Sequence, residues 1–98
     1  METKTKPFDG SEYFEHIESQ AYLLNDALAT GEAGYIADAL GTIARARGMT
    51  EIARLTGLSR GSLYAALDEK GNPGLDTLMK VLAALNLELR AAPKSDAA

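Results

Sequence analysis

Cysteine is absent from this chain of 98 residues, and so is any long apolar run. Without cysteine there is no disulfide and no thiolate metal site. No stretch approaches the roughly 20 apolar residues needed to cross a bilayer, and the first residues, METKTKPFDG, lack the apolar segment of a secretory signal. We therefore expect a cytoplasmic protein with no membrane partner.

Catalytic signatures are scarce as well. His16 is the single histidine, and with no cysteine to accompany it we expect a solvent-facing helix residue rather than a metal ligand. No nucleophile with a matching base, no phosphate-binding glycine loop and no arguable pair of catalytic acids can be found. We expect neither an enzyme nor a bound cofactor or metal.

The composition is that of a single globular domain, with 46% hydrophobic and 24% charged residues. The formal net charge of -4 is unevenly placed. Residues 1–31 carry the whole acidic excess, because residues 32–98 contain as many acidic as basic side chains. The acidity of the chain is therefore local.

Apolar residues recur at steps of three and four, the spacing that places them on one face of a helix. The first helix is expected from Ser11, as its cap, to Gly31, as its stop. A second ends at Gly48, two short ones span about residues 50–56 and 60–68, and a last one ends at Asn86 in the left-handed conformation. The defining apolar residues of the three longer helices are Phe14, Ile17, Ala21, Leu24 and Leu28, then Ile36, Leu40, Ile43 and Ala44, then Leu75, Leu78, Met79, Leu82 and Leu85. The pattern predicts an all-α fold of five helices.

The two ends are expected to differ from the helical domain, residues 11–92. Residues 1–10 contain Pro7 and Gly10 and are predicted to form a flexible arm, and residues 93–98 a frayed tail. Apolar and polar residues alternate over residues 87–92, which allows a short strand. Such a strand needs a partner, either a second subunit or a bound protein.

Residues 50–67, TEIARLTGLSRGSLYAAL, meet the requirements of a helix-turn-helix. The motif needs a small residue where the two helices meet, a residue that tolerates positive φ in the turn, and apolar residues that hold the second helix. Ala53, Gly57, Leu58 and Leu63 stand at these places, with Ile52 facing inward.

The start of the second helix of this motif offers candidate DNA-binding side chains. Ser59 is placed to cap the helix, and the end that follows is the one that enters the major groove in such proteins. The guanidinium of Arg60 can donate two parallel hydrogen bonds to guanine O6 and N7, whereas Ser62 and Tyr64 can reach a base or a phosphate. The candidate set is Thr50, Ser59, Arg60, Gly61, Ser62 and Tyr64.

Other interpretations of these residues stay open. Glycine inside a helix costs about 1 kcal/mol relative to alanine, so Gly61 either admits the phosphate backbone closely or argues against DNA binding. Similar spacing occurs in helical hairpins that never touch DNA, and a lone arginine is often only solvated. Arg45, Arg47 and Arg54 could support phosphate contacts, although arginine in a last helical turn also compensates the helix dipole.

Two longer stretches, ALGTIARARGMTEIARLTGLSRGSLYAAL and KGNPGLDTLMKVLAALNLEL, together resemble the addiction-module antidote family, HigA-like antitoxins with a lambda-repressor-type helix-turn-helix. The resemblance covers roughly residues 20–92. It implies a five-helix lambda-repressor-like domain whose recognition helix is Arg60 to Leu67, with Ser59, Arg60, Ser62 and Tyr64 on the DNA side. Gly61 departs from the larger polar residue usual in the family.

The resemblance also implies partners: a toxin of the RelE/ParE superfamily that the protein silences, and operator DNA that it represses as a homodimer. Because such toxins are generally basic, the acidic first third is a candidate toxin-binding region. We expect the dimer interface within Leu75 to Ala91. There are two alternatives: a stand-alone transcriptional regulator, and a protein-binding module whose helix-turn-helix never binds DNA.

Overall fold

The computed structural model describes the backbone of residues 10–94 and the side chains from His16 to Lys94. Five helices follow one another: α1 (Gly10–Thr30), α2 (Ala33–Arg47), α3 (Met49–Thr56), α4 (Arg60–Ala66) and α5 (Leu75–Ala84). The all-α, five-helix prediction is confirmed.

The ends of the chain differ in part from expectation. The helix expected from Ser11 begins one residue earlier, at Gly10, so Ser11 lies inside the first turn rather than at the cap. The helix can begin at Gly10 because both Gly10 and Ser11 can adopt helical dihedral angles in a first turn. The remainder of the predicted arm, residues 1–9, and residues 95–98 of the predicted tail lie outside the described residues. No strand occurs within residues 10–94, and residues 87–94 are irregular, because no second strand is present to pair with them.

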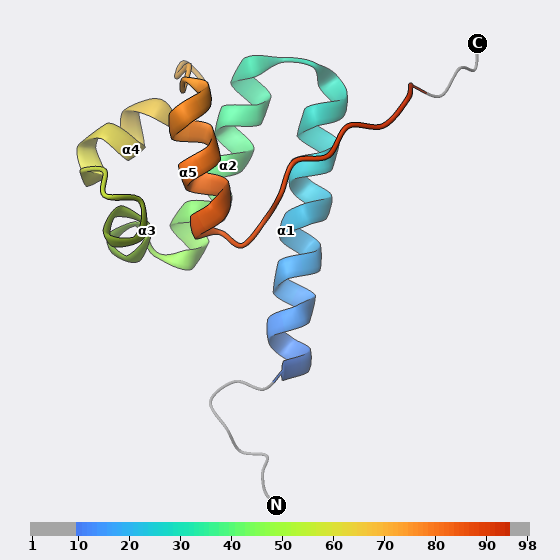
Figure 1. The fold of residues 1–98 in the computed structure, drawn as a ribbon, viewed down its shortest axis with the longest axis horizontal. Helices are drawn as coiled ribbons and strands as arrows, with labels where there is room; N and C mark the ends of the chain where they lie inside the picture. Colours follow the sequence, from blue (N-terminus) through green and yellow to red (C-terminus); the bar gives the residue numbers. More distant parts are fainter. Residues whose placement is uncertain (1–9, 95–98) are drawn as a thin grey trace, which may run out of the picture.

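The helices form two groups that meet at α2 (Figure 1). On one side α1 and α2 make an antiparallel hairpin, and among the described residues the backbone of α1 lies close to no other helix. On the other side α2 packs against α3 and α4, and α5 packs against α3. After α5 the chain runs back across α1, which places Leu87 and Leu89 beside Ala21 and Leu28.

The predicted helix stops are confirmed. Gly31 ends α1 with φ 69°, and Gly48 alone separates α2 from α3 with φ 108°. Asn86 is the single non-glycine residue among those described that has positive φ, at 62°, directly after the last turn of α5. Asparagine tolerates this left-handed conformation better than most residues, so it can terminate the helix.

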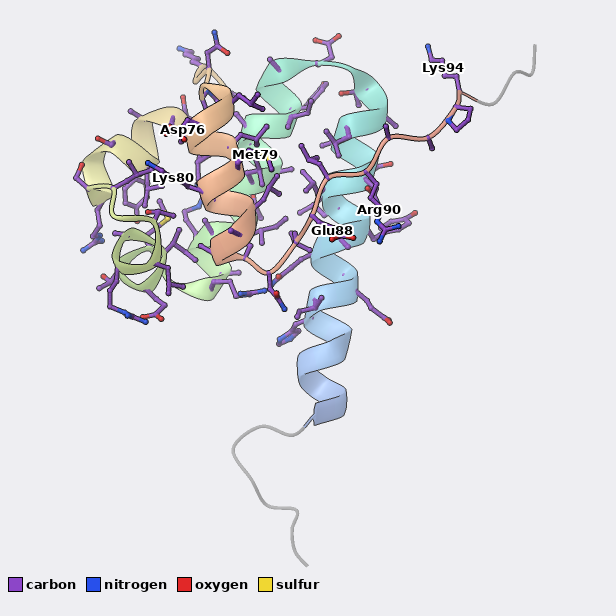
Figure 2. The ribbon with its side chains drawn as sticks, viewed as in Figure 1. Asp76, Met79, Lys80, Glu88, Arg90 and Lys94 are labelled. Carbon is purple, nitrogen blue, oxygen red and sulfur yellow. The ribbon has the colours of Figure 1, made fainter. Side chains whose placement is uncertain are left out.

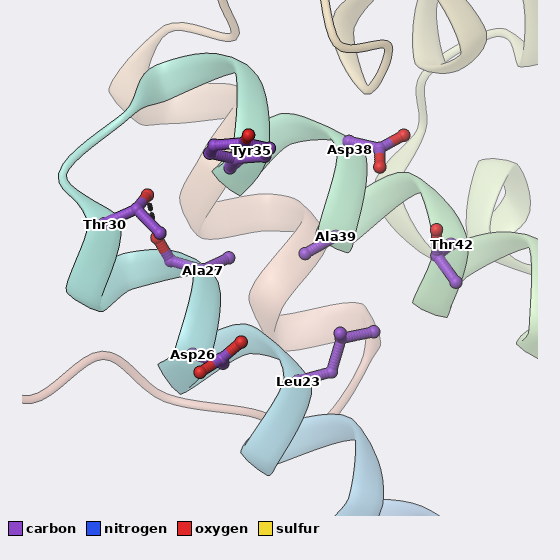
Figure 3. Close-up of a pocket in the computed structure, with 8 residues that line it drawn as sticks. All are labelled: Leu23, Asp26, Ala27, Thr30, Tyr35, Asp38, Ala39 and Thr42. Atoms are coloured by element: carbon purple, nitrogen blue, oxygen red, sulfur yellow. Dashed lines mark hydrogen bonds between the residues drawn. The ribbon is translucent and has the colours of Figure 1, made fainter.

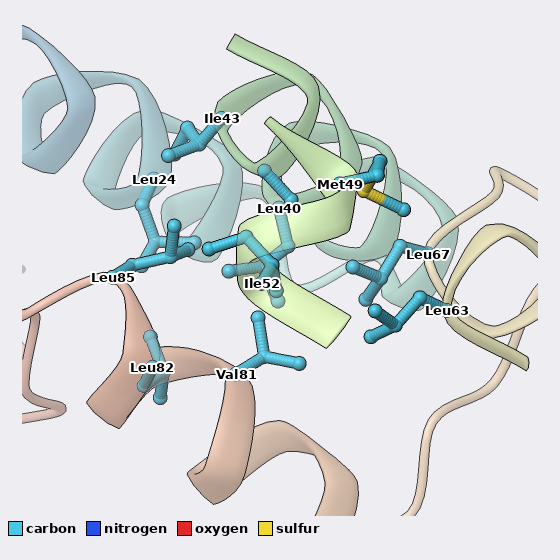
Figure 4. Close-up of a cluster of buried hydrophobic side chains, with 11 residues drawn as sticks. Leu24, Leu40, Ile43, Met49, Ile52, Leu63, Leu67, Val81, Leu82 and Leu85 are labelled. Carbon is cyan, nitrogen blue, oxygen red and sulfur yellow. The ribbon is translucent and has the colours of Figure 1, made fainter. Parts of the chain in front are cut away.

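The core lies where α2, α3, α4 and α5 converge (Figure 4). Each fully buried leucine or isoleucine contributes about 1.5–3 kcal/mol relative to an exposed one. The largest fully buried side chains of the core are Leu40, Ile43, Ile52, Leu63, Leu67, Val81, Leu82 and Leu85. Leu24 joins this cluster from α1 and so ties the hairpin to the other helices.

The buried face of the last helix differs from the set of apolar residues that marks the helix in the sequence. Leu75 and Met79 belong to that set, yet they are 70% and 47% exposed, while Val81 is fully buried. The core face of α5 follows Leu78, Val81, Leu82 and Leu85 because that side meets α3. Met79 lies on the outward side, beside the ion pair between Asp76 Oδ2 and Lys80 Nζ at 3.2 Å (Figure 2).

Gly41 sets how closely α2 approaches the end of α4. A Cβ atom on this buried residue would overlap the carbonyl oxygen of Leu67, the residue that caps α4. Glycine in the middle of a helix lowers its stability by about 1 kcal/mol relative to alanine. Here that cost is offset by close packing, which fixes the position of α4 on the body of the protein.

Candidate nucleic-acid interface

The turn between α3 and α4 is held by local hydrogen bonds. Gly57 adopts the left-handed conformation with φ 78°, and its N–H donates to Ala53 O at 2.9 Å. The hydroxyl of Thr56 donates to Ile52 O at 2.8 Å and accepts from Leu58 N at 3.2 Å. The three residues between the helices are thus fixed, as the helix-turn-helix pattern predicts.

Ser59 caps α4, which confirms the capping prediction. Its Oγ accepts from the N–H of Ser62 at 3.0 Å and donates its own proton to Ser62 Oγ at 2.9 Å. The cap satisfies one of the free N–H groups at the helix start. The donor of Ser59 is therefore engaged in the cap, whereas Ser62 keeps its hydroxyl proton to offer to a ligand.

The remaining predicted residues of α4 lie on its exposed side. Leu63, fully buried, anchors the opposite side of the helix. Arg60 is exposed and forms no ion pair or hydrogen bond with any residue that the structure describes, and Tyr64 is 43% exposed. A Cβ atom on Gly61 would meet no protein atom within 4 Å, so nothing within the described protein requires glycine there. The structure therefore brings Arg60, Gly61, Ser62 and Tyr64 together around one short exposed helix.

Thr50 is exposed in the first turn of α3. Gly48 precedes this helix and provides no side-chain cap, so free N–H groups remain at its start. Such groups bind phosphates readily. Glu51 follows Thr50 directly and brings a negative charge into the same turn.

The three supporting arginines have different roles. Arg47 cannot serve as a free phosphate contact, because its Nη2 donates to Leu85 O at 2.8 Å and its Nε to Gln20 Oε1 at 3.2 Å. It links the end of α2 to α1 and to the C-terminus of α5, where carbonyl groups lack helical partners. Arg45 is exposed and has only a long contact of 3.4 Å with Thr42 Oγ1.

Arg54 forms a two-point ion pair with Glu51, one turn earlier on α3. The distance from Arg54 Nε to Glu51 Oε1 is 3.1 Å, and Nη2 donates to the other carboxylate oxygen. The hydrogen bonds from Arg54 lower the pKa of the Glu51 carboxyl, and those bonds raise the pKa of the guanidinium in turn. The positive charge of Arg54 is therefore largely compensated within α3.

The structural roles of Arg47 and Gly41 were not identified from the sequence. The hydrogen bonds of Arg47 join residues 27 and 38 positions apart, a separation over which no local pattern carries information. Gly41 did offer a signal, because a glycine in the interior of a helix commonly has a packing reason.

Other kinds of site find no support in the described part of the chain. No group of three or more histidine, aspartate or glutamate side chains among the described residues is arranged to hold a metal ion. None of the described helices is both long and apolar enough to span a membrane.

The chain is similar to known proteins over most of its length. A family model described as "Probable addiction module antidote protein" matches residues 4–93. An uncharacterized protein of Haemophilus influenzae is 44% identical over 90 residues, which cover 92% of this chain and 93% of that protein. No solved structure matches the chain.

Proposed function

The chain belongs to the "Probable addiction module antidote protein" family, and from this premise we propose that it is a cytoplasmic antitoxin that also represses its own operon. It neutralises a basic toxin of the RelE/ParE superfamily and binds operator DNA through α4. The observation that carries the DNA-binding part is the exposed start of α4. There Arg60 lies near Ser62 and Tyr64 and forms no ion pair with any described residue.

In this proposal Arg60 recognises a guanine through O6 and N7, a contact that discriminates against other bases by about 1–3 kcal/mol. Ser62 and Tyr64 contact a base or phosphate, and the start of α3 at Thr50 faces the DNA backbone. Ser59 acts mainly by holding the first turn of α4 in place. The lambda-repressor-type, HigA-like arrangement implied by the sequence is adopted here as part of the proposal.

The proposal includes a homodimer. A recognition helix of seven residues contacts few base pairs by itself. Two-fold pairing places two such helices about 34 Å apart on one side of the duplex. The exposed apolar residues of α5, Leu75 and Met79, lie within the region predicted to form the interface and support that assignment.

A fluorescence-anisotropy titration tests the DNA-binding part of the proposal. The protein is titrated against the DNA upstream of its gene and against a scrambled duplex, at two salt concentrations. We expect tight binding to the upstream DNA alone, weakening as salt rises because counterions are released when phosphates are neutralised. Equal or absent binding to both duplexes at both salts would reject the repressor function of the isolated protein.

One observation favours the alternative, in which the helix-turn-helix is a protein-binding scaffold. Residues 48–74 carry three basic and three acidic side chains, and Arg54 is held by Glu51. A DNA-binding surface ordinarily has an excess of positive charge. The scaffold predicts no operator binding at any salt, so the same titration distinguishes the two functions.

The toxin-binding part rests on the acidic excess of residues 1–31. We expect a variant lacking residues 1–18 to bind the protein encoded by the adjacent reading frame more weakly than the full chain does. Calorimetric titration measures this difference. Unchanged affinity would show that the acidic first third does not contribute to the toxin interface through those residues.

A further inference from the structure

A groove runs between α1 and α2 on the hairpin side of the molecule (Figure 3). Its volume is about 430 Å³, and each helix contributes four of the residues that line it. They include Leu23, Asp26 and Ala27 from α1, and Tyr35, Asp38 and Ala39 from α2.

The groove has an apolar floor and an apolar rim. Ala27 and Ala39 line the groove and are 8% and 6% exposed. Leu23 and Tyr35 also line it and are 39% and 63% exposed. Large apolar side chains that gather around a hollow, rather than lie scattered, are typical of a protein-binding surface.

The charge of the groove is negative. Asp26 and Asp38 face it from opposite helices, and neither forms an ion pair with any described residue. Past Tyr35 and Asp38 the groove continues into a second hollow lined by Glu32, Glu69 and Lys70. The two hollows together hold four carboxylates and one ammonium group.

The groove is separate from the proposed DNA contact. Among the described residues the backbone of α1 lies close to no helix of the helix-turn-helix, and Glu69 and Lys70 follow the C-terminal end of α4. Arg60 and Ser62 lie at the opposite, N-terminal end of α4. A ligand in the groove and DNA at α4 therefore occupy different ends of the molecule.

We propose that this groove is the docking site for a segment of the toxin that presents an arginine or lysine between apolar residues. This inference rests on the proposed antitoxin function. The cation lies against the ring of Tyr35 and between the carboxylates of Asp26 and Asp38, and the apolar stem of the same side chain covers Ala27 and Ala39. The apolar residues that flank this cation in the toxin segment cover Leu23.

Charge complementarity selects this occupant. A purely apolar segment would bury Asp26 and Asp38 without partners, which is costly, and an acidic one would be repelled. A guanidinium fits best, because it is planar, stacks on an aromatic ring and donates to two carboxylates.

The test is calorimetric titration of the full chain with the protein encoded by the adjacent reading frame. Three groove variants are compared with wild type, the single variants Asp26→Asn, Asp38→Asn and Tyr35→Ala. The matched control is Asp68→Asn, which also removes one exposed carboxylate but lines neither hollow and lies outside the region predicted to form the dimer interface. Circular dichroism melts verify folding, which should persist because Asp26, Tyr35 and Asp38 are exposed.

We expect the dissociation constant to rise by about tenfold or more for each groove variant and to stay within about twofold for the control. Operator binding should be unchanged in all of them. Groove variants that bind like wild type would overturn the groove while leaving the toxin partnership standing. An equal loss in the control would also overturn it, since general charge attraction would then suffice. Failure of the wild-type protein to bind would overturn the toxin partnership and the groove together.

Discussion

The substitution Gly61→Ala separates the stability of α4 from its proposed contact with DNA. A methyl group at this position meets no protein atom within 4 Å, so the folded protein accommodates it without strain. Alanine favours a helix over glycine by up to about 1 kcal/mol, less near a helix end, and Gly61 is the second residue of α4. In a domain of this size 1 kcal/mol corresponds to about 4–8 °C in Tm. We therefore expect Tm to rise by a few degrees at most.

DNA affinity should change in the opposite direction. Gly61 lies between Arg60 and Ser62 on the exposed start of α4, so a methyl group there projects towards the duplex in the proposed complex. If the DNA backbone approaches this glycine closely, the added atom separates the two surfaces and weakens the neighbouring contacts. We expect operator affinity to fall by at least about tenfold, or about 1.4 kcal/mol.

The assay combines a thermal melt with an anisotropy titration, and Gly74→Ala is its matched control. A methyl group at Gly74 also meets nothing within 4 Å, but this residue caps α5 and lies outside α4. Alanine is a poorer cap than glycine, so Tm should fall slightly while operator affinity stays the same. A more stable Gly61→Ala variant that binds operator as well as wild type would refute the close approach of DNA to Gly61.

Three further predictions concern single residues. Arg60→Ala should weaken operator binding by about 1–3 kcal/mol in anisotropy titrations, and an equal loss on scrambled DNA would make Arg60 a phosphate contact instead. Gly41→Ala should destabilise the fold by about 1–3 kcal/mol in denaturant unfolding, since its methyl group overlaps the carbonyl of Leu67; unchanged stability would contradict this account of the packing. Because hydrogen bonds from Arg54 lower the pKa of Glu51, this pair stabilises the fold above the unfolded-state pKa, and its contribution is lost as the pH falls through the lowered folded-state pKa. Glu51→Gln should therefore differ in Tm from wild type at neutral pH by more than it does in acid, and an equal difference at both would count against the pair.

The parts of the fold that depend on residues close together in the sequence were predictable. Helix stops such as Gly31 and Asn86 follow from the few residues that tolerate positive φ. The cap at Ser59 follows from the need of a helix start for an acceptor side chain. Both features are decided within a few residues of chain, so the sequence contains the information needed.

Features decided by packing were not predictable. In α5, apolar residues cover more than one helix face, so periodicity alone did not distinguish exposed Met79 from buried Val81. Arg47 looked like a charge at the end of α2, and only the meeting of α1, α2 and α5 made it a structural hydrogen-bond donor. The groove between α1 and α2 likewise forms only when the two helices pack, which brings Asp26 and Asp38 to the same surface.

The arrangement of charge explains how an acidic chain can be proposed to bind DNA. At physiological ionic strength exposed charges are screened over about 8 Å, whereas the molecule extends 51 Å along its longest axis. The carboxylates of the α1–α2 groove therefore act on whatever approaches the groove, and the net charge of -4 says little about the field at α4. At α4 the supporting charge is modest, since Arg47 is structural and Arg54 is compensated by Glu51. In the proposed complex, sequence-specific contacts from Arg60 in each subunit of the dimer provide the binding energy that the electrostatic field does not.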